Sequence, residues 1–188
     1  MNGRVVPHSV IAEQSVLGAA FLSKYALQKI CDELTRDSFY VEAHAKIFDC
    51  IAELKADNIP IDMTTVAGRL KDKKELVAIG DIDYLLAIVN SVPTAANIDY
   101  YINIVNQKSL LRRLIDTTSE ISTNAFNEEM DFNELIEGAE RKIFSVSKLF
   151  QDFLFFFVKG FGNPYINVND HISPAIAVYA RKTFSFKS

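Results

Sequence analysis

The sequence predicts an all-α protein with three successive parts. Apolar residues recur at helical spacings through most of the first 150 positions. Glycine and proline, which interrupt helices, number only 7 and 5 in 188 residues. A hydrophobic share of 49% beside 23% charged residues is typical of a globular protein with a real core. We expect a compact helical head over residues 5–93, a long antiparallel helical hairpin over 94–149, and an irregular, aromatic-rich C-terminal tail over 150–188.

Five helices are expected in the head. Polar residues that can accept hydrogen bonds from the first free N–H groups of a helix mark several of their starts. Ser9 precedes the first helix, Asp62 precedes the fourth, and Asp81 precedes the fifth. Apolar residues at spacings of three and four then give each helix an inward face. The expected ranges are about 10–22, 25–34, 41–56, 63–72 and 82–91.

The hairpin begins directly after a proline. Pro93 blocks any helix that arrives from before it, and Thr94 is expected to cap a new helix. No Gly or Pro interrupts residues 94–137, so this helix is expected to run from 95 to about 122, a length of about 40 Å. Asp131, followed three residues later by Glu134, resembles a capping box and begins a second helix over about 132–148. A helix of that length has more apolar surface than a small head covers, which indicates packing against another chain.

Two groups of hairpin residues are candidates for contact with other proteins. The predicted dimer interface consists of Ile98, Tyr101, Ile102, Val105 and Ile143. Three further residues, Ile115, Ile121 and Phe126, lie on the outer part of the hairpin. They have two alternative roles: ordinary hairpin core, or an apolar patch that binds a partner protein.

The distribution of charge argues against DNA binding by this chain alone. The net charge is −4, and residues 151–188 hold four basic and two acidic side chains, so residues 1–150 carry −6. An acidic surface repels phosphates. The basic pair Arg112–Arg113 is expected to be solvated or ion-paired, as such pairs on helices usually are, rather than bound to DNA.

No catalytic or metal-binding residue is predicted. His8, His44 and His171 are scattered without ligand spacing, and His44 is expected to be a packed helix residue. Glu13 has no suggested partner acid or histidine, so a capping or interface role is expected rather than catalysis. The only two cysteines, at positions 31 and 50, also lack metal spacing and are expected to be reduced core thiols.

Five short motifs are distributed over residues 5–149. They are Pro7-x-Ser9-x-x-Ala12-Glu13-x-x-Val16-Leu17-Gly18, Pro60-Ile61-Asp62-x-x-Thr65-Val66, Pro93-Thr94-Ala95-Ala96-Asn97-Ile98, Lys108-x-x-Leu111-Arg112-Arg113-Leu114-Ile115 and Glu140-Arg141-Lys142-Ile143-Phe144. Together they resemble the N-terminal domain of bacterial replicative DNA helicases of the DnaB family. One departure is Ile11, where that family usually has an acidic residue.

The resemblance implies an assembly role. Head and hairpin are then expected to pair with a second copy, and three such dimers to form the collar of a hexameric ring. The collar is expected to recruit primase through a patch that includes Tyr84, Ile115, Ile121 and Phe126. The implied partners are a homo-oligomer, primase and the full-length helicase, with DNA contacted only indirectly through the ring. The implied location is the cytoplasm.

The family resemblance also implies what this chain does not do. Full-length members bind ATP and Mg in a RecA-like motor domain, but this sequence contains no Gly-x-x-x-x-Gly-Lys-[Ser/Thr] motif. No cofactor and no ATP hydrolysis are therefore expected here, and the chain is interpreted as an assembly and primase-docking module. Two alternatives remain open: a truncated or frame-shifted copy of a full ATP-dependent helicase, and a stand-alone regulator that binds the full-length helicase.

The tail departs from the family pattern and holds seven of the 14 phenylalanines in residues 151–188. Three runs with poor alternation, Phe153–Val158, Tyr165–Val168 and Ala175–Tyr179, are candidates for short strands. The alternatives are a segment without an evolved fold, such as an out-of-frame extension, a lineage-specific tail that packs on the hairpin, and a membrane or nucleic-acid contact through Phe and Lys.

Overall fold

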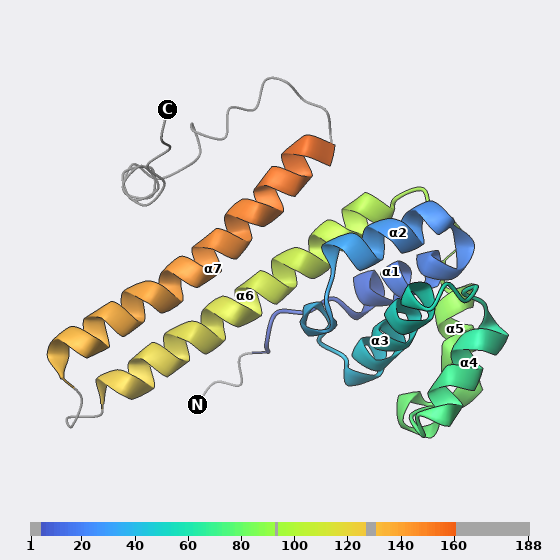
Figure 1. Ribbon diagram of the computed structural model, residues 1–188, viewed down its shortest axis with the longest axis horizontal. Helices are drawn as coiled ribbons and strands as arrows, with labels where there is room; N and C mark the ends of the chain where they lie inside the picture. Colours follow the sequence, from blue (N-terminus) through green and yellow to red (C-terminus); the bar gives the residue numbers. More distant parts are fainter. Residues whose placement is uncertain (1–4, 93, 127–130, 161–188) are drawn as a thin grey trace. The chain divides into compact units, whose positions relative to one another are not determined.

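A computed structural model describes residues 5–92, 94–126 and 131–160, with the side chains of the last helix described up to residue 146. All regular elements within these residues are helical, which confirms the predicted all-α class. The helices are α1 (Val10–Leu22), α2 (Lys24–Glu33), α3 (Glu42–Ala56), α4 (Met63–Asp72), α5 (Asp81–Asn90), α6 (Ile98–Ala125) and α7 (Phe132–Gly160), with short 3₁₀ turns η1 (Arg36–Ser38) and η2 (Val77–Ile79) (Figure 1).

The chain divides into two compact units, Met1–Ala139 and Glu140–Ser188, so the boundary lies within α7. The first unit contains the head helices together with the whole of α6. Two long helices form: α6 has 28 residues, close to the expected length, and α7 has 29, more than expected. Their antiparallel pairing stays a prediction.

The last helix extends further than the sequence predicts. It ends at Gly160 rather than near residue 148, so Phe153–Val158 is helical and the expected strand there is wrong. No Gly or Pro separates this run from the rest of α7. Its apolar residues do not alternate with polar ones, so a strand in this place would have no polar face for the solvent. The other two strand candidates, Tyr165–Val168 and Ala175–Tyr179, lie outside the described residues.

Several helix starts are confirmed at the level of hydrogen bonds. The Ser9 hydroxyl accepts the Ala12 N–H at 3.3 Å at the start of α1. Asp62 and Thr65 form a reciprocal capping box on α4: the carboxylate accepts the Thr65 N–H at 2.8 Å, and the threonine hydroxyl accepts the Asp62 N–H at 3.1 Å. The Asp131 carboxylate accepts two N–H groups in the first turn of α7, at 2.9 and 3.2 Å.

The start of α6 differs from the expectation. The helix begins at Ile98 rather than at 95, and Asn97 occupies the cap position without a side-chain hydrogen bond. Thr94 instead accepts the Ala96 N–H at 3.2 Å within a local turn. Because a threonine hydroxyl can hydrogen-bond two residues on as readily as it caps a helix, the sequence alone does not distinguish the two outcomes.

Helix α5 also begins differently, because Asp81 is its first residue and not its cap. Gly80 occupies the cap position with φ of 101°, a left-handed conformation that glycine adopts without strain. Asp81 follows with φ of 65°, and its own carboxylate accepts the Ile82 N–H at 2.8 Å. These two residues turn the chain sharply from η2 into α5.

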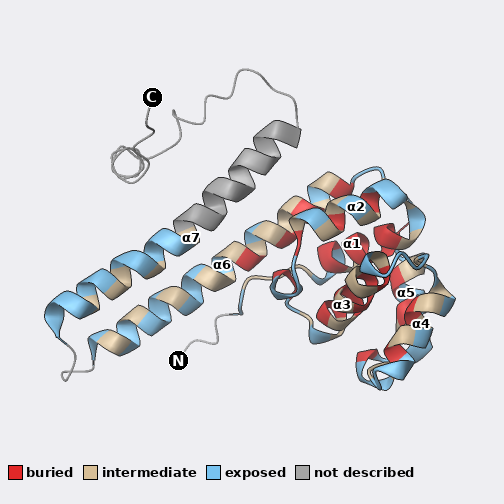
Figure 2. Cartoon of the chain, viewed as in Figure 1, coloured by how far each residue is buried: buried red, intermediate tan, exposed pale blue. Residues whose placement is uncertain are grey.

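The core of the head surrounds α1. Figure 2 shows buried residues concentrated in the head helices, whereas α6 becomes more exposed as it extends away from the head. Gly18 lets α1 and α5 approach closely, since a Cβ at this position lies only 2.7 Å from the Ile88 carbonyl oxygen and from a Val92 methyl group. Cys50 is fully buried, and burial raises the pKa of its thiol to about 11. Both cysteines are free thiols, but only Cys50 belongs to the core as predicted, because Cys31 is half-buried.

Candidate protein-interaction surface

The first turns of α6 are part of the core of the head. Ile98, Ile102 and Val105 are only 2%, 1% and 2% exposed, because this stretch packs against α1 and α2. Their side chains are already covered within the chain, which leaves them almost no area to bury against a second copy. Their assignment to a dimer interface stays a prediction. An apolar stripe at helical spacing has the same form whether the covering surface belongs to the same chain or to another one. Tyr101 is half-buried against the same core, and Ile143 is exposed on α7.

Polar contacts reinforce this attachment of α6. Lys29 of α2 forms an ion pair with Asp99 at the start of α6. Further along, Asn106 donates to the Glu33 carbonyl at 3.4 Å, and Ser109 donates to the Asp37 carbonyl at 3.2 Å. The side chains of α6 thus satisfy backbone carbonyls that the connection between α2 and α3 leaves free.

Arg112 is the last residue of α6 that makes a hydrogen bond to the head among the described residues. Its guanidinium donates to the Pro7 carbonyl at 3.1 Å and to the Asp37 and Ser38 carbonyls at 3.2 and 2.8 Å. It also lies over the ring of Tyr40, 5.9 Å from the centroid. Burial lowers the pKa of Arg112 below the ordinary arginine value. Its donors are directed into the protein, which supports a structural role over a DNA contact.

A buried polar network connects three helices of the head. The Glu13 carboxylate of α1 accepts the Tyr40 and Val41 N–H groups at 2.9 and 3.3 Å, next to the start of α3. It also contacts Nδ1 of His44 at 2.7 Å, and Nε2 of the same ring contacts the Tyr84 hydroxyl of α5 at 2.8 Å. A carboxylate oxygen accepts, so Nδ1 of His44 is the donor to Glu13, and Nε2 and the Tyr84 hydroxyl share a second hydrogen bond.

This network confirms His44 as a packed helix residue, but it gives Glu13 a histidine partner that the sequence did not suggest. Glu13 is a capping residue, but it caps α3 from a distance rather than its own helix, and His44 is completely buried. The Tyr84 hydroxyl is hydrogen-bonded to His44, and the Tyr84 side chain packs against the core. The network was hard to predict from the sequence, because Glu13 and His44 are 31 residues apart and His44 and Tyr84 are 40 residues apart.

From Leu111 onward, α6 exposes an apolar face. Leu111, Leu114 and Ile115 are exposed, Ile121 is half-buried, and Phe126, directly after the helix, is 85% exposed. We call these five residues the distal α6 face. Residues three, four and seven positions apart lie on the same side of a helix, so most of them form one continuous strip. The face includes two leucines that the sequence analysis did not assign to the patch.

The structure does not bring all four residues of the predicted partner patch together. Ile115, Ile121 and Phe126 follow one another along α6, but Tyr84 lies on α5. Figure 1 shows α5 within the head and the last turns of α6 projecting from it. A helix rises about 1.5 Å per residue, so Phe126 is about 40 Å along the axis from Ile98. Tyr84 and Phe126 therefore belong to separate surfaces.

No group of three His, Cys, Asp or Glu side chains among the described residues is arranged to hold a metal ion. In the described part of the chain, no helix is both long enough and apolar enough to cross a bilayer.

Comparisons with known proteins agree with the motifs. The family model for the DnaB-like helicase N terminal domain matches residues 5–107. Replicative DNA helicase DnaB of Geobacillus stearothermophilus is 41% identical over 145 residues, which is 77% of this chain and 32% of that protein. Replicative DNA helicase DnaC of Bacillus subtilis (strain 168) is 41% identical over 148 residues, or 79% of this chain and 33% of that protein. This chain therefore spans about a third of the length of the curated relatives that it matches.

Solved structures share the fold. The crystal structure of the N-terminal domain of DnaB helicase from Mycobacterium tuberculosis is 36% identical, with a TM-score of 0.72 over 76% of this chain and 99% of that one. A DnaB-like replicative helicase, solved together with its interactions with primase, has the same fold at 22% identity and a TM-score of 0.59, over 73% of this chain and 30% of that one. The resemblance that the sequence motifs indicated is confirmed, and this chain belongs to the family of DnaB-like helicase N-terminal domains.

Proposed function

We propose that this chain is the assembly and primase-docking module of a replicative DNA helicase. The observation that carries the proposal is the contrast between the two halves of α6. The apolar residues Ile98, Ile102 and Val105 of the first half are covered by the head, whereas those of the distal α6 face are exposed or, at Ile121, half-buried. A soluble domain rarely leaves such a strip uncovered unless another protein binds it.

Assembly of several copies is the first part of the proposal. Membership of the DnaB N-terminal domain family supports it, since the matched relatives are replicative helicases. With Ile98, Ile102 and Val105 buried in the head, the apolar contacts between copies come from Leu111, Leu114 and Ile115. An oligomer that displays several docking sites raises the local concentration of a weakly bound partner without any new contact.

Primase docking is the second part. The helicase that was solved together with its interactions with primase shares the fold, which supports primase as the partner. Phe126 is the best anchor on the distal α6 face, because a fully exposed aromatic ring gains the most from insertion into a pocket of a partner. Ile121 lies five positions earlier and extends the same contact.

Mutation of the exposed half of α6 tests both parts. Leu111→Ser with Leu114→Ser is expected to lower the molecular mass of the full chain by light scattering, with the far-ultraviolet circular dichroism unchanged. Phe126→Ala with Ile121→Ala is expected to abolish binding of a primase C-terminal domain. Two exposed head residues provide controls: Leu22→Ser for the leucines and Tyr25→Ala for the aromatic ring. An unchanged mass would refute assembly through this face, and retained primase binding would refute docking at Phe126.

A further inference from the structure

Helix α5 exposes an apolar ridge on the head. Ile82 and Leu86 are 50% and 45% exposed, and Val77, in the preceding turn η2, is 80% exposed. Residues four apart on a helix are neighbours, so Ile82 and Leu86 form one continuous contact surface. The opposite side of α5 is fully used, because Leu85 and Ile88 are completely buried in the core. Helix α5 is therefore apolar on two sides, and only one of them is covered.

The segment that carries this ridge, from residue 75 onward, is acidic. Residues 75–107 contain no Lys or Arg but four acids: Glu75, Asp81, Asp83 and Asp99. Glu75 pairs with Lys46 at 3.0 Å, and Asp99 pairs with Lys29, so these two carboxylates are compensated.

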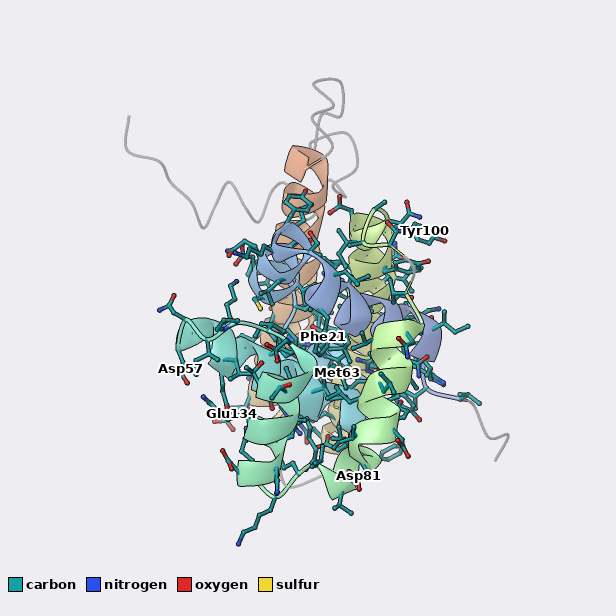
Figure 3. All side chains as sticks on the ribbon, turned by 90° about the vertical axis from the view of Figure 1, so that its right-hand side faces the viewer. Phe21, Asp57, Met63, Asp81, Tyr100 and Glu134 are labelled. Atoms are coloured by element: carbon teal, nitrogen blue, oxygen red, sulfur yellow. The ribbon has the colours of Figure 1, made fainter. Side chains whose placement is uncertain are left out.

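Asp81 and Asp83 are different. Both are exposed, and neither forms an ion pair with any cation in the described part of the chain. Asp81 lies at the outer end of α5 (Figure 3), and its position is fixed by its hydrogen bond to the Ile82 N–H. Two uncompensated carboxylates thus border an uncovered apolar row.

We propose that the α5 ridge, defined as Val77, Ile82 and Leu86 with Asp81 and Asp83, docks an amphipathic helix of a partner protein that carries Lys or Arg beside its apolar row. A row of side chains one helical turn apart fits the groove between the rows of another helix. The carboxylates attract cations and select against acidic partners. Nucleic acid is excluded by the same charges, because phosphates are repelled.

A second copy of this chain fits the ridge poorly. A two-fold contact brings the same patch of both copies together, so Asp81 and Asp83 of one copy would face those of the other. No Lys or Arg of α5 is present to compensate them. The α5 ridge is also separate from the distal α6 face, so this docking site is additional to the proposed function and does not depend on it.

The test uses the full chain and a pair of fluorescent probe peptides. One peptide is a short designed amphipathic helix with leucines on one side and lysines flanking them; the other has glutamate in place of each lysine. The lysine peptide is expected to bind by fluorescence anisotropy and to slow hydrogen exchange of residues 77–90. Ile82→Ser with Leu86→Ser is expected to weaken its binding by about tenfold or more, as loss of two apolar contacts predicts.

A separate variant tests the contribution of the two carboxylates to binding. Asp81→Asn with Asp83→Asn is expected to weaken binding severalfold and to reduce its dependence on salt. Asparagine tolerates the left-handed conformation at position 81 and keeps the oxygen that accepts the Ile82 N–H, so the fold is preserved. Leu22→Ser, a change at a leucine of matching exposure on α1, is the control and is expected to bind normally.

Three results would overturn the proposal: equal binding of both peptides, protection that falls on α6 instead of α5, or a change of molecular mass in the Ile82→Ser, Leu86→Ser variant. The last result would assign the ridge to a second copy. The two proposals can fail independently of each other. Phe126→Ala tests the proposed function and leaves the α5 ridge intact, whereas Leu86→Ser tests the ridge and leaves the distal α6 face intact.

Discussion

Replacement of Glu13 by alanine is expected to destabilise the head far more than an ordinary change on α1. The carboxylate accepts hydrogen bonds from the Tyr40 and Val41 N–H groups and from His44. Alanine leaves these donors without an acceptor in a region that is closed to water around His44, which is completely buried. An unsatisfied buried donor lowers stability by about 1–3 kcal/mol.

The magnitude follows from the exposure of each donor. Tyr40 is exposed, so water can replace its lost partner, whereas Val41 is half-buried and His44 is completely buried. Counting two donors, we expect the free energy of unfolding to fall by about 3–5 kcal/mol. This is a large share of the roughly 5–15 kcal/mol that stabilises a typical domain. Glu13→Gln keeps the size of the side chain and one acceptor oxygen, so an intermediate loss is expected.

Urea unfolding followed by circular dichroism, at one fixed protein concentration, measures these changes. Gln14→Ala is the matched control, since it alters the next residue of the same helix and is expected to change stability by less than about 0.5 kcal/mol. Hydrogen exchange gives a second readout, because loss of the cap should expose the amides of Tyr40 and Val41 before those of α2. The reasoning is refuted if Glu13→Ala behaves like Gln14→Ala, or if protection of these two amides is unchanged.

Three further predictions concern other parts of the head. Gly18→Ala is expected to destabilise the protein by about 1–3 kcal/mol in urea unfolding, because its Cβ would lie 2.7 Å from the Ile88 carbonyl oxygen; wild-type stability would contradict the close packing. Arg112→Ala is expected to lower stability by about 1–3 kcal/mol through loss of charged hydrogen bonds to three carbonyls, and faster hydrogen exchange around Ser38 checks this effect. Burial raises the pKa of the Cys50 thiol to about 11, so at pH 8 it is almost entirely protonated and a disulfide reagent is expected to label it only after unfolding. Cys31 is a half-buried second free thiol, so the labelled residue is identified by mass spectrometry, and rapid labelling of Cys50 in the native protein would refute this.

The positions of the helices were predictable because their boundaries depend on neighbouring residues. Ser9, Asp62 and Asp131 cap helices within three residues of themselves, and the structure shows each of these hydrogen bonds. The errors at Thr94 and Asp81 are also local, since a short polar side chain has more than one nearby N–H to choose from.

The contacts within the head were not predictable, because they join residues that are far apart in sequence. Nothing near Glu13 indicates that His44 and Tyr84 complete its environment. Arg112 likewise shows no sequence sign that its partners are the carbonyls of Pro7, Asp37 and Ser38. The covering of Ile98, Ile102 and Val105 by the head is a third case, since periodicity identifies an apolar stripe but not the surface that covers it.

The burial of Ile98 and Ile102 in the head decides how assembly can be tested. Aspartate at Ile98 or Ile102 would place an unpaired charge in the core of the head, and the resulting loss of stability would abolish any interface indirectly. A shift to monomer in such a variant therefore says nothing about where copies meet. Arg112 marks the point at which the hydrogen bonds from α6 to the head end, and the exposed leucines on either side of it can be changed without opening the core. Variants at Leu111 and Leu114 separate assembly from folding, and a monomer that keeps the unfolding free energy of the wild type is the result that locates the interface on the distal α6 face.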